Sequence, residues 1–418
     1  MSELASPWSG RSHAELATLA RELLLAGHMI DRASMPHLIG AYGPEEMRDV
    51  AIDEWMAASP VYTKRAQRLL DFEGDTVEVI FKGMQFDIGA PPEFLDFRYE
   101  VLDDHHGTFH LDHCGALMDV EPMGDELVRI MCHDIEDPTF DATATATNPR
   151  AQVRPVHRPP RLPADREPHC AWTVTIVPEA DPLPVPPGAV SLGTSRAGSL
   201  PLAVAPDDLP TDDGDSDYSG PLDPDLVTER FSSATLARIL DEVGVQCHLL
   251  SRAGMLAVAD RYGIDAAVDI GRRQLTGVAG LATKRLAATL GVAADLDGVA
   301  EVLAVNPAFV PRTYVALRVE RSGDALLVSI DPCPALEEDD GLTWPALLVS
   351  GDDTPIAAAV QCLLPTAQVE RTGEASWRIW DDPTAVPAPN PEAVVLTEFS
   401  TGAEFSFQRI PDPVRRRT

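Results

Sequence analysis

A repeat at a nearly constant spacing is the feature that most constrains the fold of this 418-residue chain. The segment HMIDRASM at 28–35 matches HLLSRAGM at 248–255, and TKR at 63–65 recurs at 283–285. Both matches have an offset of 220 residues, and their order along the chain is the same. Ordered matches at one spacing indicate an internal repeat, so the chain is expected to contain two copies of one fold.

The repeat continues into the later part of each copy. The segment HLDHCGAL at 110–117 meets SIDPCPAL at 329–336 at an offset of 219. We therefore predict copy one at 12–178 and copy two at 229–382, and we expect the two to fold alike and pack with pseudo-twofold symmetry.

The pattern within each copy predicts an α+β fold. Leu16, Leu19 and Leu23 recur at helical spacing, and the region around them predicts a helical layer. Segments 94–102 and 107–113 alternate apolar and polar residues, which is typical of strands. A polar helical stretch and two more strands follow, so each copy is expected to be a helical layer plus an antiparallel sheet with a crossing helix.

Two regions fall outside the copies. Residues 179–228 are rich in Pro, Gly and Asp and predict a linker without a core of its own, because too little apolar surface is present. In the C-terminal region, 383–418, the stretch 392–410 alternates around Ser-Thr-Gly and predicts a hairpin. Three arginines at 415–417 form a basic tail.

Composition limits the partners and the compartment. The net charge is −33, which disfavours polyanions, so we expect no nucleic acid and no anionic membrane as a partner. No apolar run reaches the roughly 18–20 residues that span a bilayer, and the first residues lack the order of a signal peptide. We expect a cytoplasmic protein with a small-molecule substrate, and a homodimer is an option that composition leaves open.

Histidines and cysteines concentrate in copy one. Seven of the eleven histidines and three of the six cysteines lie in 105–170. Imidazole and thiolate are ligands of zinc and other borderline metals, and carboxylates add harder oxygen ligands. The candidate functional residues found in this way are His110, His113, Cys114, Cys132, His133, Glu136, Asp137 and His157.

Comparing the copies separates fold from function among these candidates. Copy two has Ser329 and Pro332 where His110 and His113 stand, so the histidines are unique to copy one. Cys114 recurs as Cys333, which leaves open whether it is a ligand or a buried apolar residue. Strand alternation places His110 on one face and His113 on the other, so they can share an ion only if the strand bends.

A second asymmetry lies before the first predicted strand. Segment 83–100, GMQFDIGAPPEFLDFRYE, has more polar and aromatic residues than its counterpart at 304–318. It is expected either to line a substrate pocket or to be a plain loop that enters a strand.

The order of helices, hairpin, Cys-bearing turn, crossing helix and closing strands resembles the 4-vinyl reductase domains and the related L-2-amino-thiazoline-4-carboxylic acid hydrolase-like proteins. The resemblance covers each copy almost whole. Some sensor domains of the vinyl reductase family hold zinc with one ligand pair before the crossing helix and two ligands on the closing hairpin. The resemblance implies Cys132, His133, His157 and Cys170 as the matching positions. In place of the family ending Gly-Asp-x-x-Cys, this chain has REPHC at 166–170.

We expect copy two to bind no such metal, since the residues near the matching positions are Gly351, Asp352, Gly373 and Ala375.

These observations predict a metal-dependent enzyme acting on a small organic molecule. Zn²⁺ would activate a water for hydrolysis, and Glu136 or Asp137 would carry protons. Fe²⁺ is the alternative metal, with oxidative chemistry as a non-haem iron oxidoreductase. A small-molecule-binding or sensory module with a structural zinc is the alternative function, and a structural subunit of a larger complex is a third. The chain has no P-loop, GxSxG or HExxH motif that would name a reaction.

Overall fold

The computed structural model describes residues 5–408, and the elements of the chain occur in two similar series, which differ in the short helices between their second and third strands. The first series is α1 (His13–Tyr42), α2 (Pro44–Leu69), α3 (Val77–Met84), β1 (Leu95–Asp103), β2 (His106–Cys114), α4 (Gly115–Val120), η1 (Glu121–Met123), α5 (Asp125–Arg129), η2 (Ile130–Ile135), α6 (Glu136–Thr145), β3 (Ala151–His157) and β4 (Cys170–Ile176). Between the series lie α7 (Pro187–Thr194) and η3 (Thr228–Arg230). The second series is α8 (Ser233–Tyr262), α9 (Ile264–Leu290), α10 (Leu296–Val305), β5 (Leu317–Ser322), β6 (Ala325–Ile330), η4 (Pro334–Leu336), α11 (Trp344–Val349), α12 (Thr354–Gln361), β7 (Ala367–Gly373) and β8 (Ser376–Asp381), and α13 (Glu392–Thr397) follows it.

Helices α1 and α8 show how the local sequence sets the repeat. Each follows a serine N-cap, Ser12 or Ser232, whose hydroxyl accepts a hydrogen bond from a backbone N–H in the first turn. Each ends at a glycine, Gly43 or Gly263, with φ of 94° or 88°, a conformation that other residues rarely adopt. The start and stop signals are thus repeated at the offset seen in the sequence.

The two sheets have the same topology. Their strand orders are β1-β2-β4-β3 and β5-β6-β8-β7, and all neighbouring strands are antiparallel. In β2 the side chains of Phe109 and Leu111 are buried, whereas Asp112 points outward, as strand alternation requires. The predicted α+β fold in two similar halves is confirmed.

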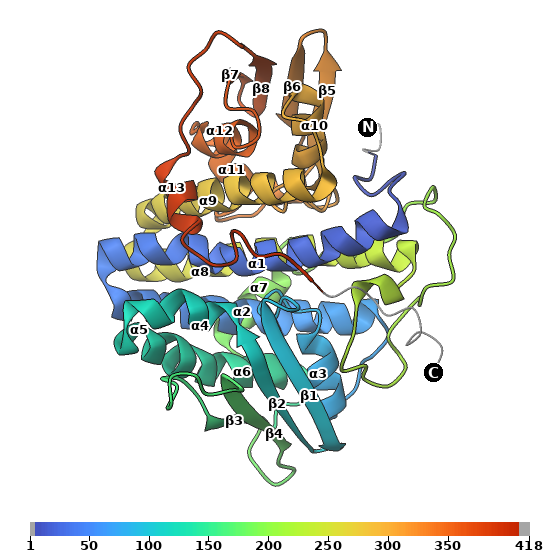
Figure 1. The fold of residues 1–418 in the computed structure, drawn as a ribbon, viewed down its shortest axis with the longest axis vertical. Coiled ribbons are helices and arrows are strands. Elements are labelled where there is room, and N and C mark those ends of the chain that lie inside the picture. Colours follow the sequence, from blue (N-terminus) through green and yellow to red (C-terminus); the bar gives the residue numbers. More distant parts are fainter. Residues whose placement is uncertain (1–4, 409–418) are drawn as a thin grey trace.

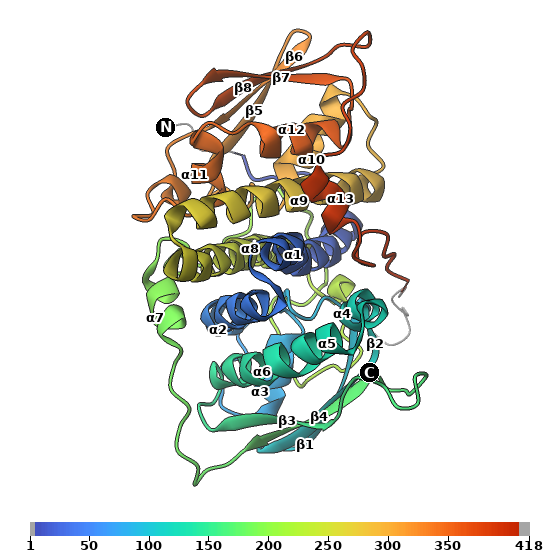
Figure 2. The ribbon, with the colours of Figure 1, turned by 90° about the vertical axis from the view of Figure 1, so that its left-hand side faces the viewer.

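The sheets lie at opposite ends of the molecule, and the long helices lie between them (Figure 1). Figure 2 shows the layers in order: the first sheet, α6 with α3, α2, α1 beside α8, α9, the short helices α10 to α12, and the second sheet. Helix α2 packs on α8 and α1 packs on α9, so each copy contributes to the environment of the other.

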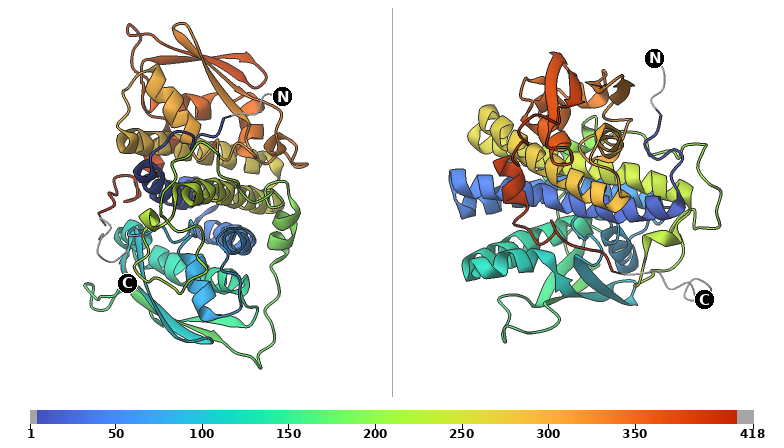
Figure 3. Two further views of the ribbon diagram at one scale, coloured as in Figure 1. Left: turned by 90° about the vertical axis from the view of Figure 1, so that its right-hand side faces the viewer. Right: turned by 45° about the horizontal axis from the view of Figure 1, so that its top comes forward.

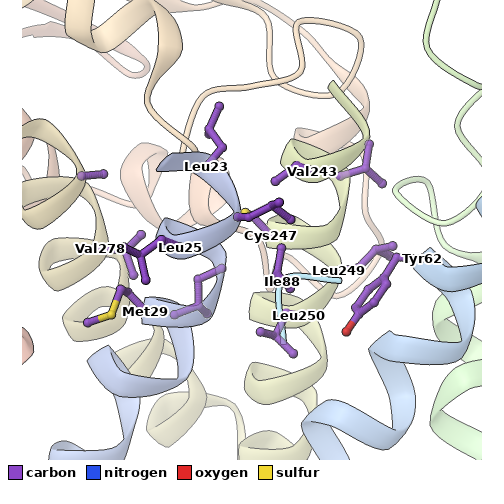
Figure 4. Close-up of a cluster of buried hydrophobic side chains, with 14 of the residues drawn as sticks. Leu23, Leu25, Met29, Tyr62, Ile88, Val243, Cys247, Leu249, Leu250 and Val278 are labelled. Atoms are coloured by element: carbon purple, nitrogen blue, oxygen red, sulfur yellow. The ribbon is translucent and has the colours of Figure 1, made fainter. Parts of the chain in front are cut away.

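The core runs through this central layer without interruption. Figure 4 shows Leu25 of α1, Cys247 of α8 and Val278 of α9 among the buried side chains that meet there. At Gly27 a Cβ atom would lie only 2.5 Å from Ile88 Cγ2, so the glycine permits the close approach of α1. The two copies therefore share one hydrophobic core.

Reciprocal ion pairs join the copies. Arg65 of α2 donates two hydrogen bonds to Glu242 of α8, at 2.8 and 2.7 Å. Arg285 of α9 donates two to Glu22 of α1, at 2.9 and 3.1 Å. Each residue of one pair is offset by 220 from its counterpart in the other, which is the arrangement that a pseudo-twofold axis produces.

The same relation appears at the helix ends, where the rings of Tyr42 and Tyr262 stack at 3.8 Å.

The segment between the copies is ordered against them. Figure 3 shows it leaving the first sheet and passing α7 on its way to α8. Leu192 and Tyr218 are buried, and the Tyr218 N–H donates to the Leu70 carbonyl at 2.7 Å. The segment thus covers the surface of the helical layer rather than adding a layer of its own.

The predicted C-terminal hairpin is wrong. Residues 392–397 form α13, whose Val394 is fully buried against α9, and no strand follows within the described part of the chain. Contact with α9 selects a helix although the local pattern alternates. Beyond α13, Ser400 donates to Asp119 of copy one at 2.6 Å. The basic tail at 415–417 lies outside the described residues.

Among the described residues, no helix combines the length and the apolar character needed to cross a membrane.

Candidate functional site

The predicted ligands on β2 do not converge. His110 Nε2 lies 3.3 Å from Asp112 Oδ1, and both side chains face outward, with exposed fractions of 41% and 51%. His113 lies instead beside His169 and Phe405, with ring centroids 6.0 and 6.3 Å away. The strand does not bend enough to bring the two histidines to one ion.

Two other predicted ligands stabilise the proline-rich loop between β3 and β4. His133 Nε2 donates to the Pro159 carbonyl at 2.6 Å, and His157 Nε2 donates to the Pro168 carbonyl at 3.0 Å. Each ring thus has a backbone partner in this loop.

The crossing helix consists of α5, η2 and α6 without a break. Its middle part, η2, is π-helical, a form that is rare and is often found at functional sites. Cys132 lies in η2, and Glu136 is the first residue after η2. Both residues line one cavity. This stretch of helix therefore places two of the predicted residues at the same internal surface.

Three predicted thiols are close enough to Glu136 for its charge to act on them. Cys114, Cys132 and Cys170 are all buried and free. Burial and, to a smaller extent, the charge of Glu136 raise the pKa of Cys114 to about 12. The pKa values of Cys132 and Cys170 are raised well above the usual range for the same two reasons. The thiols are thus protonated near neutral pH, and none is an activated nucleophile.

The ligand set implied by the resemblance is not assembled. Across residues 5–408, no three side chains of the His, Cys, Asp and Glu types are arranged so that they could hold a metal ion. Three predicted thiols approach Glu136, whereas the four predicted histidines lie elsewhere. The described side chains are not arranged as a Zn²⁺ or Fe²⁺ site in this structure, so the predicted metal centre gains no support here and stays a prediction.

Copy one contains a cavity of about 120 Å³ between α1, α2, α6 and the first sheet. Its walls are largely apolar, with Phe97, Leu111 and Phe140 among them. Of the two alternatives left open for segment 83–100, the structure shows the pocket wall, because the segment contributes Met84, Asp87, Gly89, Ala90, Leu95 and Phe97. A cavity of roughly 150 Å³ accommodates benzene, so this one suits a molecule of about that size.

Two neighbouring carboxyl groups are buried at the α1 and α2 side of the cavity. Asp31, which lines it, is 3% exposed, and Glu54 is 1% exposed. Asp31 Oδ2 accepts a hydrogen bond from Trp55 Nε1 at 3.1 Å, whereas Asp31 Oδ1 and Glu54 Oε1 have no partner. Unpartnered buried carboxyl oxygens are costly, which indicates that the pair serves something other than stability.

Burial also controls the protonation of this pair. It raises the pKa of Glu54 well above the usual range, and the charge of Asp31 adds to the shift. The pKa of Asp31 is raised by burial as well, while Arg32 acts in the opposite direction. The pair therefore keeps a proton under conditions in which exposed carboxyl groups have lost theirs.

Two further carboxyl groups line the cavity and differ in pKa. Burial raises the pKa of Asp87 to about 6, while hydrogen bonds from Tyr62 and Gly89 favour its charged form. Burial raises the pKa of Glu136 to about 8, with Arg158 opposing the shift, and Glu136 Oε2 has no partner. At pH 7 Glu136 thus carries a proton and Asp87 is largely ionised.

Asp137, the other predicted proton carrier, is not at the cavity. It accepts a hydrogen bond from Arg158, and it is not among the residues that line the cavity. Of the two predicted catalytic residues, only Glu136 faces the cavity.

The one arginine of the cavity already has an acidic partner. Arg32 Nε lies 3.5 Å from Asp119 Oδ2, and Arg32 Nη1 lies 3.8 Å from Asp31 Oδ2. Asp119 also accepts hydrogen bonds from Ser400 and Thr401. Copy two keeps this arrangement, since Arg252 lies 3.3 Å from Glu338. The arginine–carboxylate pair is therefore part of the fold in both copies.

Copy two replaces the other acids with neutral groups. At the offset of 220, Ser251 stands for Asp31 and Gln274 for Glu54. Asn306 stands for Asp87, because it accepts the same hydrogen bond from the N–H two residues on.

The space beside these neutral groups in copy two is filled. Trp344 is fully buried, lies 5.4 Å from the ring of His248 and donates to Gln274 at 3.3 Å. His248 is the counterpart of His28, which lines the cavity of copy one. The acids and the open cavity occur together in copy one, and both are replaced together in copy two.

Asp31, Glu54 and Asp87 were missed by reasoning from the sequence. The signal was present in the repeat itself, because HMIDRASM and HLLSRAGM differ by an aspartate against a serine. A search for ionisable residues that become neutral in an otherwise matched copy would have found this difference.

Comparison with protein-family models, with curated proteins and with solved structures finds no match to this chain. Function is therefore inferred from the cavity and its residues.

Proposed function

We propose that the chain is an enzyme that acts on a small organic molecule bound in the copy-one cavity, with Glu136 as the proton donor. The proposal keeps the substrate class and one proton carrier that the sequence suggests. It places the chemistry on carboxyl groups, because these are the groups that face the cavity.

The observation that supports the proposal best is the contrast between the copies. Copy one buries Asp31, Glu54 and Asp87, whereas the matched positions of copy two are neutral. Burying carboxyl groups without full partners destabilises a protein, and the same fold tolerates neutral residues there. A function located at this cavity explains why the costly residues are present in one copy alone.

The pKa values suit acid–base chemistry. Glu136, with a pKa of about 8, can donate a proton to a leaving group or to a carbonyl oxygen at neutral pH. Asp87, with a pKa of about 6, can accept one from water. Two carboxyl groups whose surroundings separate their pKa values in one site are the usual basis of acid and base roles. Hydrolysis, the reaction that the resemblance implies, needs such a division of roles.

A small-molecule-binding module is the second candidate. The buried thiols around Glu136 have raised pKa values and supply no nucleophile, so covalent catalysis through cysteine gains no support. The same cavity without turnover would be a sensor site.

Mass spectrometry of compounds retained by the purified full-length chain tests the proposal. Thr143 lines the cavity, so Thr143→Phe fills it, and Thr145→Phe on the same helix is the matched control. We expect a retained compound in the wild type and the control, and its loss in Thr143→Phe. Equal retention by all three, or no compound that Thr143→Phe displaces, contradicts the proposed site.

Glu136→Gln then separates catalysis from binding, because Gln keeps the shape but cannot donate the acidic proton. For an enzyme, the variant retains a compound that differs in mass from the one in the wild type. Identical compounds in both would instead support the binding module.

A further inference from the structure

We infer that the molecule in the copy-one cavity carries a positively charged nitrogen, which lies against Asp31 beside Trp55, with an apolar body against Phe97 and Phe140. The inference rests on the proposed function, since it names the class of molecule that the same cavity accepts.

The charges around the cavity favour a cation. Three carboxyl residues line it, namely Asp31, Asp87 and Glu136, and Glu54 lies behind Asp31. The arginine among the lining residues, Arg32, lies 3.5 Å from Asp119 Oδ2 and 3.8 Å from Asp31 Oδ2, so one guanidinium group faces several carboxyl groups. An added cation would offset the charge that these acids develop, whereas an added anion would meet acids on several sides.

The groups that a cation could contact lie at the end of the cavity formed by Asp31 and Trp55. Asp31 is nine-tenths buried, lines the cavity, and has a carboxylate oxygen, Oδ1, without a partner. Trp55 donates its N–H to the other oxygen of Asp31 and so fixes the orientation of the carboxylate. An ammonium group is a strong donor to such an oxygen, and an indole ring is the aromatic surface that attracts cations best.

A metal ion is a poorer match for this end. It requires three or more converging donors, and the described residues contain no such group. An organic ammonium needs one carboxylate and an apolar surround, and both are present here. The size of the cavity, about 120 Å³, limits the body to roughly one six-membered ring with a short side group.

The residues of copy two also support binding of a cation in copy one. It retains the arginine–carboxylate pair through Arg252 and Glu338 but has Ser251 in place of Asp31. The carboxylate that would bind the cation is thus absent from the copy in which Trp344 fills the space.

Three probes of similar size and different charge test the inference: benzylamine, benzyl alcohol and benzoate. Binding to the purified full-length chain at pH 7 is measured by ligand-observed NMR titration, with intrinsic tryptophan fluorescence as a second readout. We expect benzylamine to bind at least about tenfold more tightly than benzyl alcohol, and benzoate to bind most weakly.

Two variants locate the effect. Asp31→Asn keeps an acceptor for Trp55 but removes the charge, so it should abolish the preference for benzylamine. Asp53→Asn makes the same change at an outward-facing carboxylate of the same helical layer, paired with Arg261, and should leave the preference intact. If Asp31→Asn does not fold, Glu54→Gln, which installs the copy-two residue, should weaken benzylamine binding while leaving benzyl alcohol unchanged.

The outcomes distinguish failure of the inferred cation from failure of the proposed site. Equal binding of benzylamine and benzyl alcohol, lost in Thr143→Phe, would overturn the cation and leave the proposed site intact. Binding of no probe, together with no effect of Thr143→Phe on retained compounds, would overturn both. A preference for benzylamine that Asp31→Asn does not change would also refute the inference, because the charge would then lie elsewhere.

Discussion

Copy one and copy two have similar folds but different interiors. Their helices begin and end at matched residues and their sheets have the same strand order. They differ at the interior surface, where copy one has carboxyl groups around a cavity and copy two has neutral groups and Trp344. The fold alone therefore does not require the buried acids, and their presence in copy one calls for another cause.

The largest change in stability is expected when the side chain of Trp344 is removed from the interior of copy two. Trp344→Ala removes a fully buried side chain and should lower the free energy of unfolding by about 3–5 kcal/mol, because a cavity remains where the indole was. Urea denaturation measures the loss. A loss below roughly 1 kcal/mol would show that Trp344 does not fill the second interior.

The second effect concerns the contact between the copies. Glu242→Gln leaves Arg65 buried without its charge partner and should cost about 3 kcal/mol, at the low end for breaking a buried ion pair. The control is Asp269→Asn in the exposed pair with Arg273, which should change stability by less than about 0.5 kcal/mol. Similar small losses at both sites would mean that the copies do not depend on this pair.

The third prediction exchanges residues between the copies. Gln274→Glu places the copy-one carboxyl group into copy two and should destabilise the chain by about 2 kcal/mol at pH 8, with a smaller loss at pH 5, where the group is protonated more often. Glu54→Gln, the reverse exchange, should stabilise the ligand-free chain by about 1 kcal/mol. Thermal and urea unfolding of both variants measure the difference, and destabilisation by Glu54→Gln would show that the acid serves the fold.

The smallest expected effect is a dependence on pH. The pKa of Glu136 is raised to about 8 in the folded chain, whereas an exposed glutamate titrates near about 4.3. The folded state thus binds this proton more tightly, and the free energy of unfolding falls as pH rises toward 8. The lowered pKa values of His28 and His248 act in the opposite direction, but only below about 6.5.

Between pH 6.5 and 8.5 these histidines contribute little, and titration of Glu136 is expected to lower the free energy of unfolding by about 1–2 kcal/mol. Asp241, with a pKa of about 7, titrates in the same window, so the measured quantity is the difference between wild type and Glu136→Gln. Parallel pH curves for the two proteins would contradict the assignment.

Only part of the candidate site could be predicted from the local sequence. A pocket wall was one of two alternatives for segment 83–100, and the segment lines the cavity; of the two candidate proton carriers, Glu136 faces the cavity. The histidines were chosen by residue type and proximity in sequence, but strand alternation turns His110 outward and the loop carbonyls bind His133 and His157. Residue type alone does not tell which backbone groups compete for a side chain.

The sequence by itself determined the duplication, the order of elements and the ends of the long helices, because these follow from a repeated pattern and from caps within one turn. Only the tertiary structure decided which acids are buried. Glu54 lies in α2 and is covered by α8 of the other copy, where a Cβ atom at Gly254 would lie 2.7 Å from Glu54 Oε1. The same packing decided that 392–397 is a helix, since contact with α9 outweighs the local alternation. Burial depends on surfaces that come from distant parts of the chain, and local patterns do not contain them.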